Sequence, residues 1–376
     1  MKHHNAEKIF FIASKQSRKD TLPKIFEKAK LQKQEYEVIE IDDPDNVQSI
    51  YETVGTYLQK IRAKFDNIVV DYTSGTKAMA AALAILATVH EADELSYITG
   101  KRQGGIVQPG TERVMAIQPY FATTEQKIKL AVQFFNRSQY NAAISVLTQI
   151  QNFIRDQTII NRIRPLLQLA KAYAQWDKFQ HQNAHKIILK LKIPQLNHNK
   201  RFLGQLINKL KRGEEPETYL IADLINNAQR RAEKEQKYDD AVARLYRTME
   251  LIAQYKLKSK YGIDPANAET KQIQQQLLEK WNTPPEAKTL KLTLEKDYQL
   301  LKALGDEIGQ KYAQDKKLKD LLSKRNASIL AHGLQPINKH EYTQLYNNVK
   351  DYAKTVIPNL TQLLADSKFI KWKTTI

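Results

Sequence analysis

The segment "VVDYTSGTKAMAAALAILATV", residues 69–89, joins a short β-branched run to an alanine-rich helical pattern through a small polar loop. The loop residues are Thr73, Ser74, Gly75, Thr76 and Lys77. Ligands bind at such strand-to-helix junctions in open α/β sheets, and free backbone N–H groups at a helix start favour anions. The glycine spacing is neither that of a Walker loop nor Gly-x-Gly-x-x-Gly. The loop therefore indicates an anion or nucleotide site, and simple helix capping by Thr or Ser is the alternative interpretation.

The flanking sequence places this loop in an α/β domain. Strand-like runs at 8–14, 36–41 and 67–73 alternate with helical spacing at 18–33 and 46–64. That βαβαβ order predicts parallel strands with right-handed crossovers. Two later runs, "ELSYITG" and "RVMAIQPY", read as added strands joined by a long glycine-containing loop. We expect a Rossmann-like domain, a parallel sheet with added C-terminal strands, that ends near residues 119–122.

From Thr123 onward, strand signals give way to Leu, Ile, Lys, Gln and Ala at helical spacing. This change predicts an all-α remainder, with its best internal boundary at the Gly- and Pro-containing stretch 211–217. The expected domains are an α/β domain, a helical connecting region and a C-terminal helical domain, over 1–122, 123–215 and 216–376.

Composition limits the chemistry that the protein performs. The net charge of +18 favours a polyanionic partner, although a basic surface that serves solubility alone is an alternative. The absence of cysteine excludes disulfides, thiolate metal sites and cysteine nucleophiles. No apolar run reaches membrane-spanning length and the start lacks a signal-peptide pattern, so we expect a cytoplasmic protein without a membrane partner.

Two other segments are expected at the same sheet edge as the polar loop. The first strand ends at Ser14, Lys15 and Gln16, and the loop after a later strand carries Lys101 and Arg102. Because carboxyl ends of parallel strands share one edge, these donors and charges would converge on one ligand. Each lysine or arginine could also be ordinary solvated surface.

A second group of residues stands in "LKDLLSKRNASILAHGLQP" near the C-terminus. Arg325 and His332 are seven residues apart, and seven helical steps of about 100° return to within about 20° of the start. We expect both on one helix face, with Asn326 one step round and Gly333 as the residue after the helix. His moves protons and Arg stabilises phosphorane charge, so the pair suits metal-free phosphodiester chemistry. A two-fold dimer would supply two such pairs, whereas complementing the helix dipole is the plain alternative.

No metal site is expected. His181 and His185 in "HQNAH" have the spacing of zinc ligands, but Gln182 occupies the position of the metalloprotease glutamate.

The segment "DYTSGTKAM" resembles the Asp-x-Thr-[Gly/Ser]-Gly-Thr-Lys-x-Met signature of CARF domains, and "RNASILAH" resembles the Arg-[polar]-x(3 to 5)-His motif of HEPN ribonucleases. The order of the two resembles the CARF-HEPN ancillary ribonucleases of type III CRISPR systems. "YDDAVARLYRTMEL" is similar to a helix that precedes the Arg…His segment in such proteins. Six residues between Arg325 and His332 is the long end of the family's range.

The resemblance implies a CRISPR-associated antiviral ribonuclease, a homodimer whose CARF domains bind a cyclic oligoadenylate and thereby activate paired HEPN domains. The messenger, tetra- or hexa-adenylate, acts as an allosteric activator, and no other cofactor is implied. Residues 73–77 would contact it together with Ser14 and Lys15. Arg325, Asn326 and His332 would cleave single-stranded RNA, leaving 2′,3′-cyclic phosphate and 5′-hydroxyl ends without a metal. DNA lacks the 2′-hydroxyl and should survive. Whether the CARF domain slowly cleaves its own messenger is left open.

The helix pattern at 238–251 carries an apolar stripe that we expect in the core, formed by Tyr238, Val242, Leu245, Tyr246 and Met249. Arg244, Arg247 and Glu250 lie off this stripe. Arg247 and Glu250 are supporting residues for the catalytic segment in one interpretation, and paired surface charges in the other.

Two functions compete with the ribonuclease. One is a ligand-responsive regulator that binds nucleic acid without catalysis, and the other is a helical scaffold for partner proteins. RNA cleavage that depends on messenger separates the first hypothesis from both.

Overall fold

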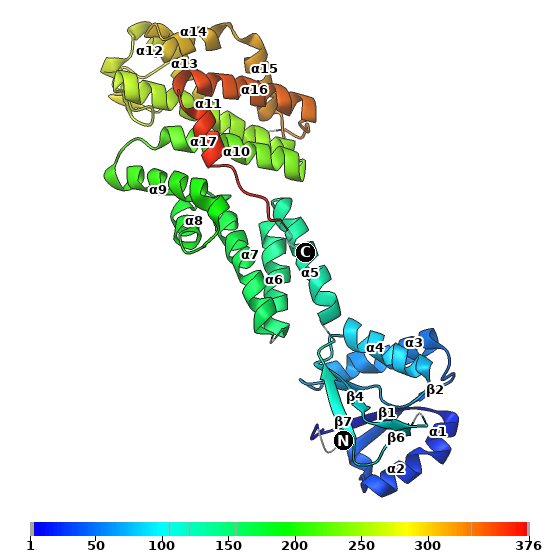
Figure 1. The fold of residues 1–376 in the computed structure, drawn as a ribbon. Helices are drawn as coiled ribbons and strands as arrows, with labels where there is room; N and C mark the ends of the chain where they lie inside the picture. Colours follow the sequence, from blue (N-terminus) through cyan, green and yellow to red (C-terminus); the bar gives the residue numbers. More distant parts are fainter. Residues whose placement is uncertain (1–3, 105, 120, 155, 332, 374–376) are drawn as a thin grey trace. The chain divides into compact units, whose positions relative to one another are not determined.

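The computed structural model describes residues 4–104, 106–119, 121–154, 156–331 and 333–373. The chain divides into two compact units, Met1–Lys129 and Leu130–Ile376 (Figure 1). The first unit mixes strands and helices, and the second is almost entirely helical.

Short strands form the centre of the first unit. They are β1 (Ile9–Ser14), β2 (Tyr36–Ile41), β3 (Val69–Asp71), β4 (Glu94–Thr99), β5 (Arg102–Gln103), β6 (Ile106–Val107) and β7 (Arg113–Ile117). The helical elements around them are α1 (Lys15–Asp20), α2 (Leu22–Ala29), the 3₁₀ turn η1 (Lys33–Glu35), α3 (Val47–Arg62) and α4 (Lys77–Val89). α5 (Phe121–Asn136) follows.

The strand pairing confirms the α/β prediction and refines it. β1 pairs in parallel with β2, and β3 pairs in parallel with β4. β7 is the added strand and runs antiparallel to β4, while β5 and β6 make a small hairpin in the connecting loop. The single predicted sheet is thus divided into β1-β2 and β3-β4-β7.

The helix expected over 18–33 is two helices instead. α1 ends at Asp20, and α2 begins at Leu22 with Pro23 in its first turn. Proline has no N–H to donate and is tolerated only at the start of a helix, so Pro23 marks a new helix rather than the interior of a longer one.

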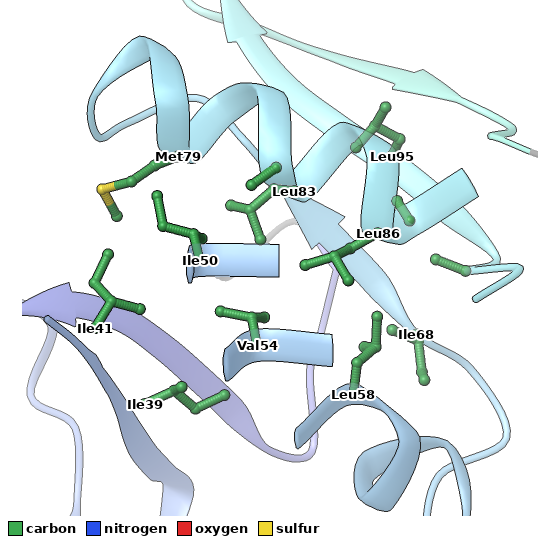
Figure 2. Packing of buried hydrophobic residues seen from close by; sticks show 13 residues of the cluster. Ile39, Ile41, Ile50, Val54, Leu58, Ile68, Met79, Leu83, Leu86 and Leu95 are labelled. Atoms are coloured by element: carbon green, nitrogen blue, oxygen red, sulfur yellow. The ribbon is translucent and has the colours of Figure 1, made fainter. Parts of the chain in front are cut away.

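The core of the first unit lies between β2, α3 and α4 (Figure 2). Ile39 and Ile41 of β2 face Ile50 and Val54 of α3, and Leu86 of α4 packs against the same group. All five side chains are almost completely buried. This burial fixes the start of α4, and therefore the polar loop before it, against the sheet.

The second unit is built from helices. They are α6 (Tyr140–Phe153), α7 (Gln157–Trp176), α8 (His181–Ile188), η2 (Pro194–Leu196), α9 (Asn197–Arg212), α10 (Glu217–Glu235), α11 (Tyr238–Tyr261), η3 (Thr270–Gln272), α12 (Gln275–Lys280), α13 (Leu294–Ala303), α14 (Glu307–Gln314), α15 (Lys316–Asn326), α16 (Lys339–Val356) and α17 (Leu360–Asp366). One short strand pair, β8 (Ala268–Glu269) with β9 (Thr289–Leu290), interrupts the expected all-α pattern.

The long helices α10 and α11 lie side by side, and α16 packs against α11 (Figure 1). Leu245 and Met249 of α11 are fully buried, and Val242 nearly so, which confirms that part of the predicted apolar stripe. Tyr238 and Tyr246 are only half-buried, so the stripe is narrower than expected.

The chain after α17 runs back to the end of α5 as an extended strap (Figure 1). Asn136 of α5 donates to the backbone oxygen of Trp372 at 3.0 Å and accepts from its N–H at 2.8 Å. Asn199 of α9 donates to the carbonyls of Asp366 and Lys368. These amide side chains replace the partner strand that an extended segment otherwise needs.

Among the described residues, every helix is either too short or too polar to span a membrane.

Candidate functional site

The polar loop after β3 is held in place by its own threonines. Thr76 is the N-cap of α4 and accepts a hydrogen bond from Met79 N–H at 3.1 Å. The Thr73 hydroxyl accepts from Ile98 N–H of β4 at 2.9 Å. The capping interpretation is therefore correct for Thr76, and these two side chains shape the loop rather than point freely to solvent.

Gly75 gives the loop its bend. Its φ of 104° lies in a region that side chains disfavour, and a Cβ there would lie 3.0 Å from Met79 Sδ. Ser74 and Lys77 are exposed, and neither side chain has a polar partner among the described residues. They are the loop side chains available to a ligand.

Polar contacts link this loop to the end of β1 through a segment that we had not predicted. The Thr76 hydroxyl donates to the Pro44 carbonyl, in the loop after β2. In the same loop, Asp42 forms an ion pair of 3.4 Å with Lys15. Ser14 caps α1 by accepting from Ser17 N–H at 3.3 Å. The ends of β1, β2, β3 and β4 therefore form one connected edge.

The remaining predicted edge residues are surface residues. Gln16, Lys101 and Arg102 are exposed, and Arg102 lies in the β5-β6 hairpin. The Lys101 N–H donates to the Thr111 hydroxyl at 3.0 Å, which holds the backbone in place.

Sequence reasoning missed the acidic loop after β2, which carries Asp42, Asp43 and Asp45. Its position was predictable, because the end of a second parallel strand belongs at the same edge. The negative charges of these carboxylates would repel an anionic ligand, and Lys15 neutralises the charge of one of them, Asp42, through their ion pair.

The second predicted site has a different local structure from the one expected. α15 ends at Asn326, and residues 327–331 form turns. Both the N–H and the hydroxyl of Ser328 bond the Arg325 carbonyl, at 3.1 Å and 2.8 Å. In a continuing helix that carbonyl would accept from residue 329, so this competition ends the helix.

The prediction that Arg325 and His332 share one helix face is therefore wrong. His332 itself lies outside the described residues. Gly333 is not a helix cap: the Gln335 N–H returns to the Ala327 carbonyl at 3.0 Å, and a Cβ on Gly333 would lie 2.1 Å from the Ala327 oxygen. The chain folds into a tight loop over Ala327, and only glycine fits at the crossing.

Arg325 is half-buried, and its guanidinium carbon lies 4.7 Å from the centre of the Tyr246 ring on α11. Its Nε is buried without a hydrogen-bond partner, and one terminal nitrogen reaches Asn326 Oδ1 at 3.4 Å. No carboxylate among the described residues pairs with it. In contrast, the neighbouring Lys324 pairs with Glu341.

Three family models match successive parts of the chain. They are the Card1 CARF domain over residues 1–125, the Csm6 6H domain over residues 123–215 and the Csm6 HEPN domain over residues 209–356. The chain is a Csm6-like CARF-HEPN protein. The connected strand edge thus belongs to the CARF domain, and Arg325 to the HEPN domain.

Among solved structures, 18 chains match. One is described as Enterococcus italicus Csm6 bound to cyclic hexa-2′-fluoro-hexa-dAMP. It matches with a TM-score of 0.59 and 14% identity, over 97% of this chain and 92% of that one. At this identity the likeness shows the shared fold. No curated protein matches the sequence.

In the HEPN domain, the exposed Arg247 pairs with the half-buried Glu250 on α11 at 3.1 Å, and Arg247 also reaches Gln254 at 3.2 Å. Beneath them, Asp297 of α13 is fully buried, and both its carboxylate oxygens lack hydrogen-bond partners among the described residues. Burial, reinforced by the charge of Glu250, raises the pKa of Asp297 to about 8. The charges of Arg247 and Glu250 therefore act on a carboxyl group that is buried in the core.

His181 belongs to the core of the 6H region. Its Nε2 lies 2.8 Å from Asp223 Oδ2, which also accepts from the Trp176 indole at 2.9 Å. His185 lies on the same helix, and burial together with the charge of Lys211 lowers its pKa. Within the described part of the chain, no group of three or more His, Asp or Glu side chains is arranged to hold a metal ion.

Proposed function

We propose that this protein is an RNA endonuclease and that a cyclic oligoadenylate activates it by binding to the connected strand edge of the CARF domain, called the CARF edge below. The observation that carries the proposal is Arg325, a half-buried arginine that has no carboxylate partner among the described residues, in a Csm6-type HEPN domain. An arginine whose charge is not neutralised by the protein is suited to a phosphate.

The proposed chemistry uses the residue types of the loop. His332 assists deprotonation of an RNA 2′-hydroxyl, whose oxygen attacks the adjacent phosphorus and displaces the 5′-oxygen of the next nucleotide. Arg325 stabilises the negative charge that develops on the phosphorane. Asn326, exposed beside Arg325, contributes a second donor to the same phosphate. The products carry a 2′,3′-cyclic phosphate and a 5′-hydroxyl.

The activator is assigned to the CARF edge. Ser74 and Lys77 are exposed beside the amino end of α4, where the helix dipole and free N–H groups attract phosphate. Because the related Csm6 structure contains a cyclic hexa-adenylate analogue, cyclic hexa-adenylate is the first messenger to test and tetra-adenylate the second.

A homodimer would bring two HEPN loops together. Ile329, Leu330 and Leu334, which flank position 332 in the sequence, are exposed. Exposed aliphatic side chains so close to an unpaired arginine favour burial against a second copy over permanent contact with water. The proposed boundaries of the three regions remain 1–122, 123–215 and 216–376.

The test is cleavage of a labelled single-stranded RNA, with each messenger in turn and in excess EDTA. We expect cleavage only with messenger, unaffected by EDTA, and abolished when the RNA carries 2′-deoxy nucleotides. The His332→Ala variant should lose activity while still binding messenger. Cleavage undiminished in His332→Ala would reject this site, and salt-sensitive RNA binding without cleavage under every messenger would favour the non-catalytic regulator.

A further inference from the structure

Arg325 occupies a poor position for a residue that must be held precisely. It is the next-to-last residue of α15, and the chain beyond it forms turns. Helix ends fray, and a long flexible side chain on a fraying turn samples many rotamers. Some contact outside α15 must therefore restrict it.

Hydrogen bonds do not provide that restriction. The buried Nε has no hydrogen-bond partner in the described part of the chain, and the bond to Asn326 at 3.4 Å comes from the adjacent residue and is long. In the part of the chain that the structure describes, the contact that reaches Arg325 from another element is the Tyr246 ring, at 4.7 Å from the guanidinium carbon. Planar guanidinium groups stack on aromatic faces, and this attraction strengthens when the pair is partly shielded from water.

The ring itself is firmly placed. Tyr246 lies within the long helix α11, between the fully buried Leu245 and Met249. An aromatic side chain on such a helix offers a rigid plane at little further cost in conformational entropy.

The Tyr246 hydroxyl plays no comparable part. It makes no hydrogen bond among the described residues, and partial burial together with the charge of Glu250 raises its pKa, although Arg325 acts in the opposite direction. The phenol therefore stays neutral at ordinary pH. What Arg325 contacts is the aromatic face, which phenylalanine also possesses.

We infer that Tyr246 is a positioning residue that holds the Arg325 guanidinium through its aromatic ring. The inference rests on the proposed ribonuclease function. The ring fixes the plane and depth of the guanidinium, so that its outer nitrogens meet the scissile phosphate without first losing rotamer freedom.

The substitutions that test this differ in one property at a time. Tyr246→Phe keeps the ring and removes the hydroxyl, and Tyr246→Leu removes the ring and keeps an apolar side chain. Tyr255→Leu, on the same helix without a stacked arginine among the described contacts, is the matched control. Single-turnover RNA cleavage by the full-length protein is measured with saturating messenger.

We expect Tyr246→Phe and Tyr255→Leu to cleave within about twofold of wild type, and Tyr246→Leu to be slower by roughly 3- to 30-fold, the range of a partly buried cation–π contact. The decisive comparison is made in the Arg325→Ala background. There, Tyr246→Leu should cause no further loss, because the group that it positions is absent. A purely structural role would slow cleavage equally in both backgrounds and would overturn the inference, as would a Tyr246→Phe enzyme as slow as Tyr246→Leu.

A second readout is independent of cleavage. In a sample labelled at arginine, the ring current of Tyr246 should shift the Arg325 side-chain resonances, and this shift should persist in Tyr246→Phe and vanish in Tyr246→Leu. A wild-type spectrum without the shift refutes the inference even if the protein cleaves RNA. If the shift is present but neither Arg325→Ala nor His332→Ala reduces cleavage, the proposed site fails while the stacking itself stands.

Discussion

The loop after β3 in the CARF domain and the end of α15 with the turns that follow it in the HEPN domain both lie at a helix end, yet their polar side chains are used differently. In the first, Thr73 and Thr76 bond to backbone atoms of β4, α4 and the loop after β2. In the second, Ser328 bonds backbone, whereas the contacts of the charged Arg325 among the described residues are with an aromatic face and a neighbouring amide. The threonines hold the CARF loop in place and leave Ser74 and Lys77 exposed. At the end of α15, by contrast, the charge of Arg325 is paired with no carboxylate among the described residues.

The comparison suggests which substitutions act on chemistry and which on stability. Removing a group that the fold already uses should cost stability, and removing a group left unpaired should cost function. The following predictions test this distinction from the largest expected effect to the smallest.

Arg325→Ala should reduce messenger-activated cleavage by about 100- to 1,000-fold, the typical cost of removing one donor that stabilises transition-state charge. Thermal stability should hardly change, because no ion pair among the described residues is broken. Lys324→Ala is the control, since this adjacent cation pairs with Glu341 and should leave the rate nearly unchanged. Equal losses in the two variants would mean that general basicity matters and that Arg325 has no special place.

Asp297→Asn should change the pH dependence of folding stability. The pKa of Asp297 rises from its ordinary 3.8 to about 8 in the folded protein. The protonated carboxyl group therefore contributes its full stabilisation of the fold below pH 3.8, and this stabilisation is lost as the pH rises through 8. The slope approaches about 1.4 kcal/mol per pH unit between these values.

Asparagine cannot ionise, so the variant should lose this slope and be more stable than wild type near pH 8. Urea unfolding at several pH values measures both effects. Asp351→Asn, an exposed residue of α16 paired with Lys354 at 3.0 Å, serves as the control. Parallel pH curves for wild type and Asp297→Asn would show that Asp297 is not the titrating group.

Lys77→Ala should weaken messenger binding roughly tenfold, because an exposed ammonium at the start of α4 would lose its bond to a phosphate. The melting temperature should stay within error, since Lys77 makes no described contact. Lys60→Ala, in the last turn of α3 at the opposite end of the parallel layer, should bind normally. Calorimetric titration with cyclic hexa-adenylate distinguishes them, and identical affinities for all three proteins would remove Lys77 from the site.

Thr76→Ala should lower the free energy of unfolding by about 1 kcal/mol, the usual cost of losing an N-cap. Thr88→Ala in the same helix removes only a bond to the Ala84 carbonyl and should be neutral. Chemical denaturation compares the two variants. A Thr76→Ala protein as stable as wild type would indicate that the hydroxyl is free for the ligand after all.

Much of the CARF domain could be predicted because its signals are local. The β-branched runs, the helical spacing of 46–64 and the Thr before α4 each report a structure within a few residues. Pro44 and Asp42 were missed because their role depends on where the second strand ends in space. The division of the predicted sheet into β1-β2 and β3-β4-β7 is likewise a matter of strand pairing that no single segment encodes.

For the HEPN motif, the chemistry could be predicted from the sequence and the local structure could not. Its residue types indicated phosphodiester chemistry, but the inferred helix through His332 assumed that helical spacing continues past Asn326. Periodicity says nothing about Ser328 competing for the Arg325 carbonyl. Tyr246 was assigned to the core for a similar reason: spacing makes it part of the apolar stripe, while its contact with Arg325 spans a large separation along the chain.

The sequence by itself determined the chemical inventory and its order: an anion-friendly loop at a strand end, an arginine and a histidine near the C-terminus, and helices between them. Only the tertiary structure decided which of those groups form bonds within the protein and which remain available to a ligand. The reason is physical, because a hydroxyl or guanidinium has the same chemistry wherever it stands. Whether it caps a helix, stacks on a ring or awaits a ligand depends on neighbours that folding brings from elsewhere in the chain.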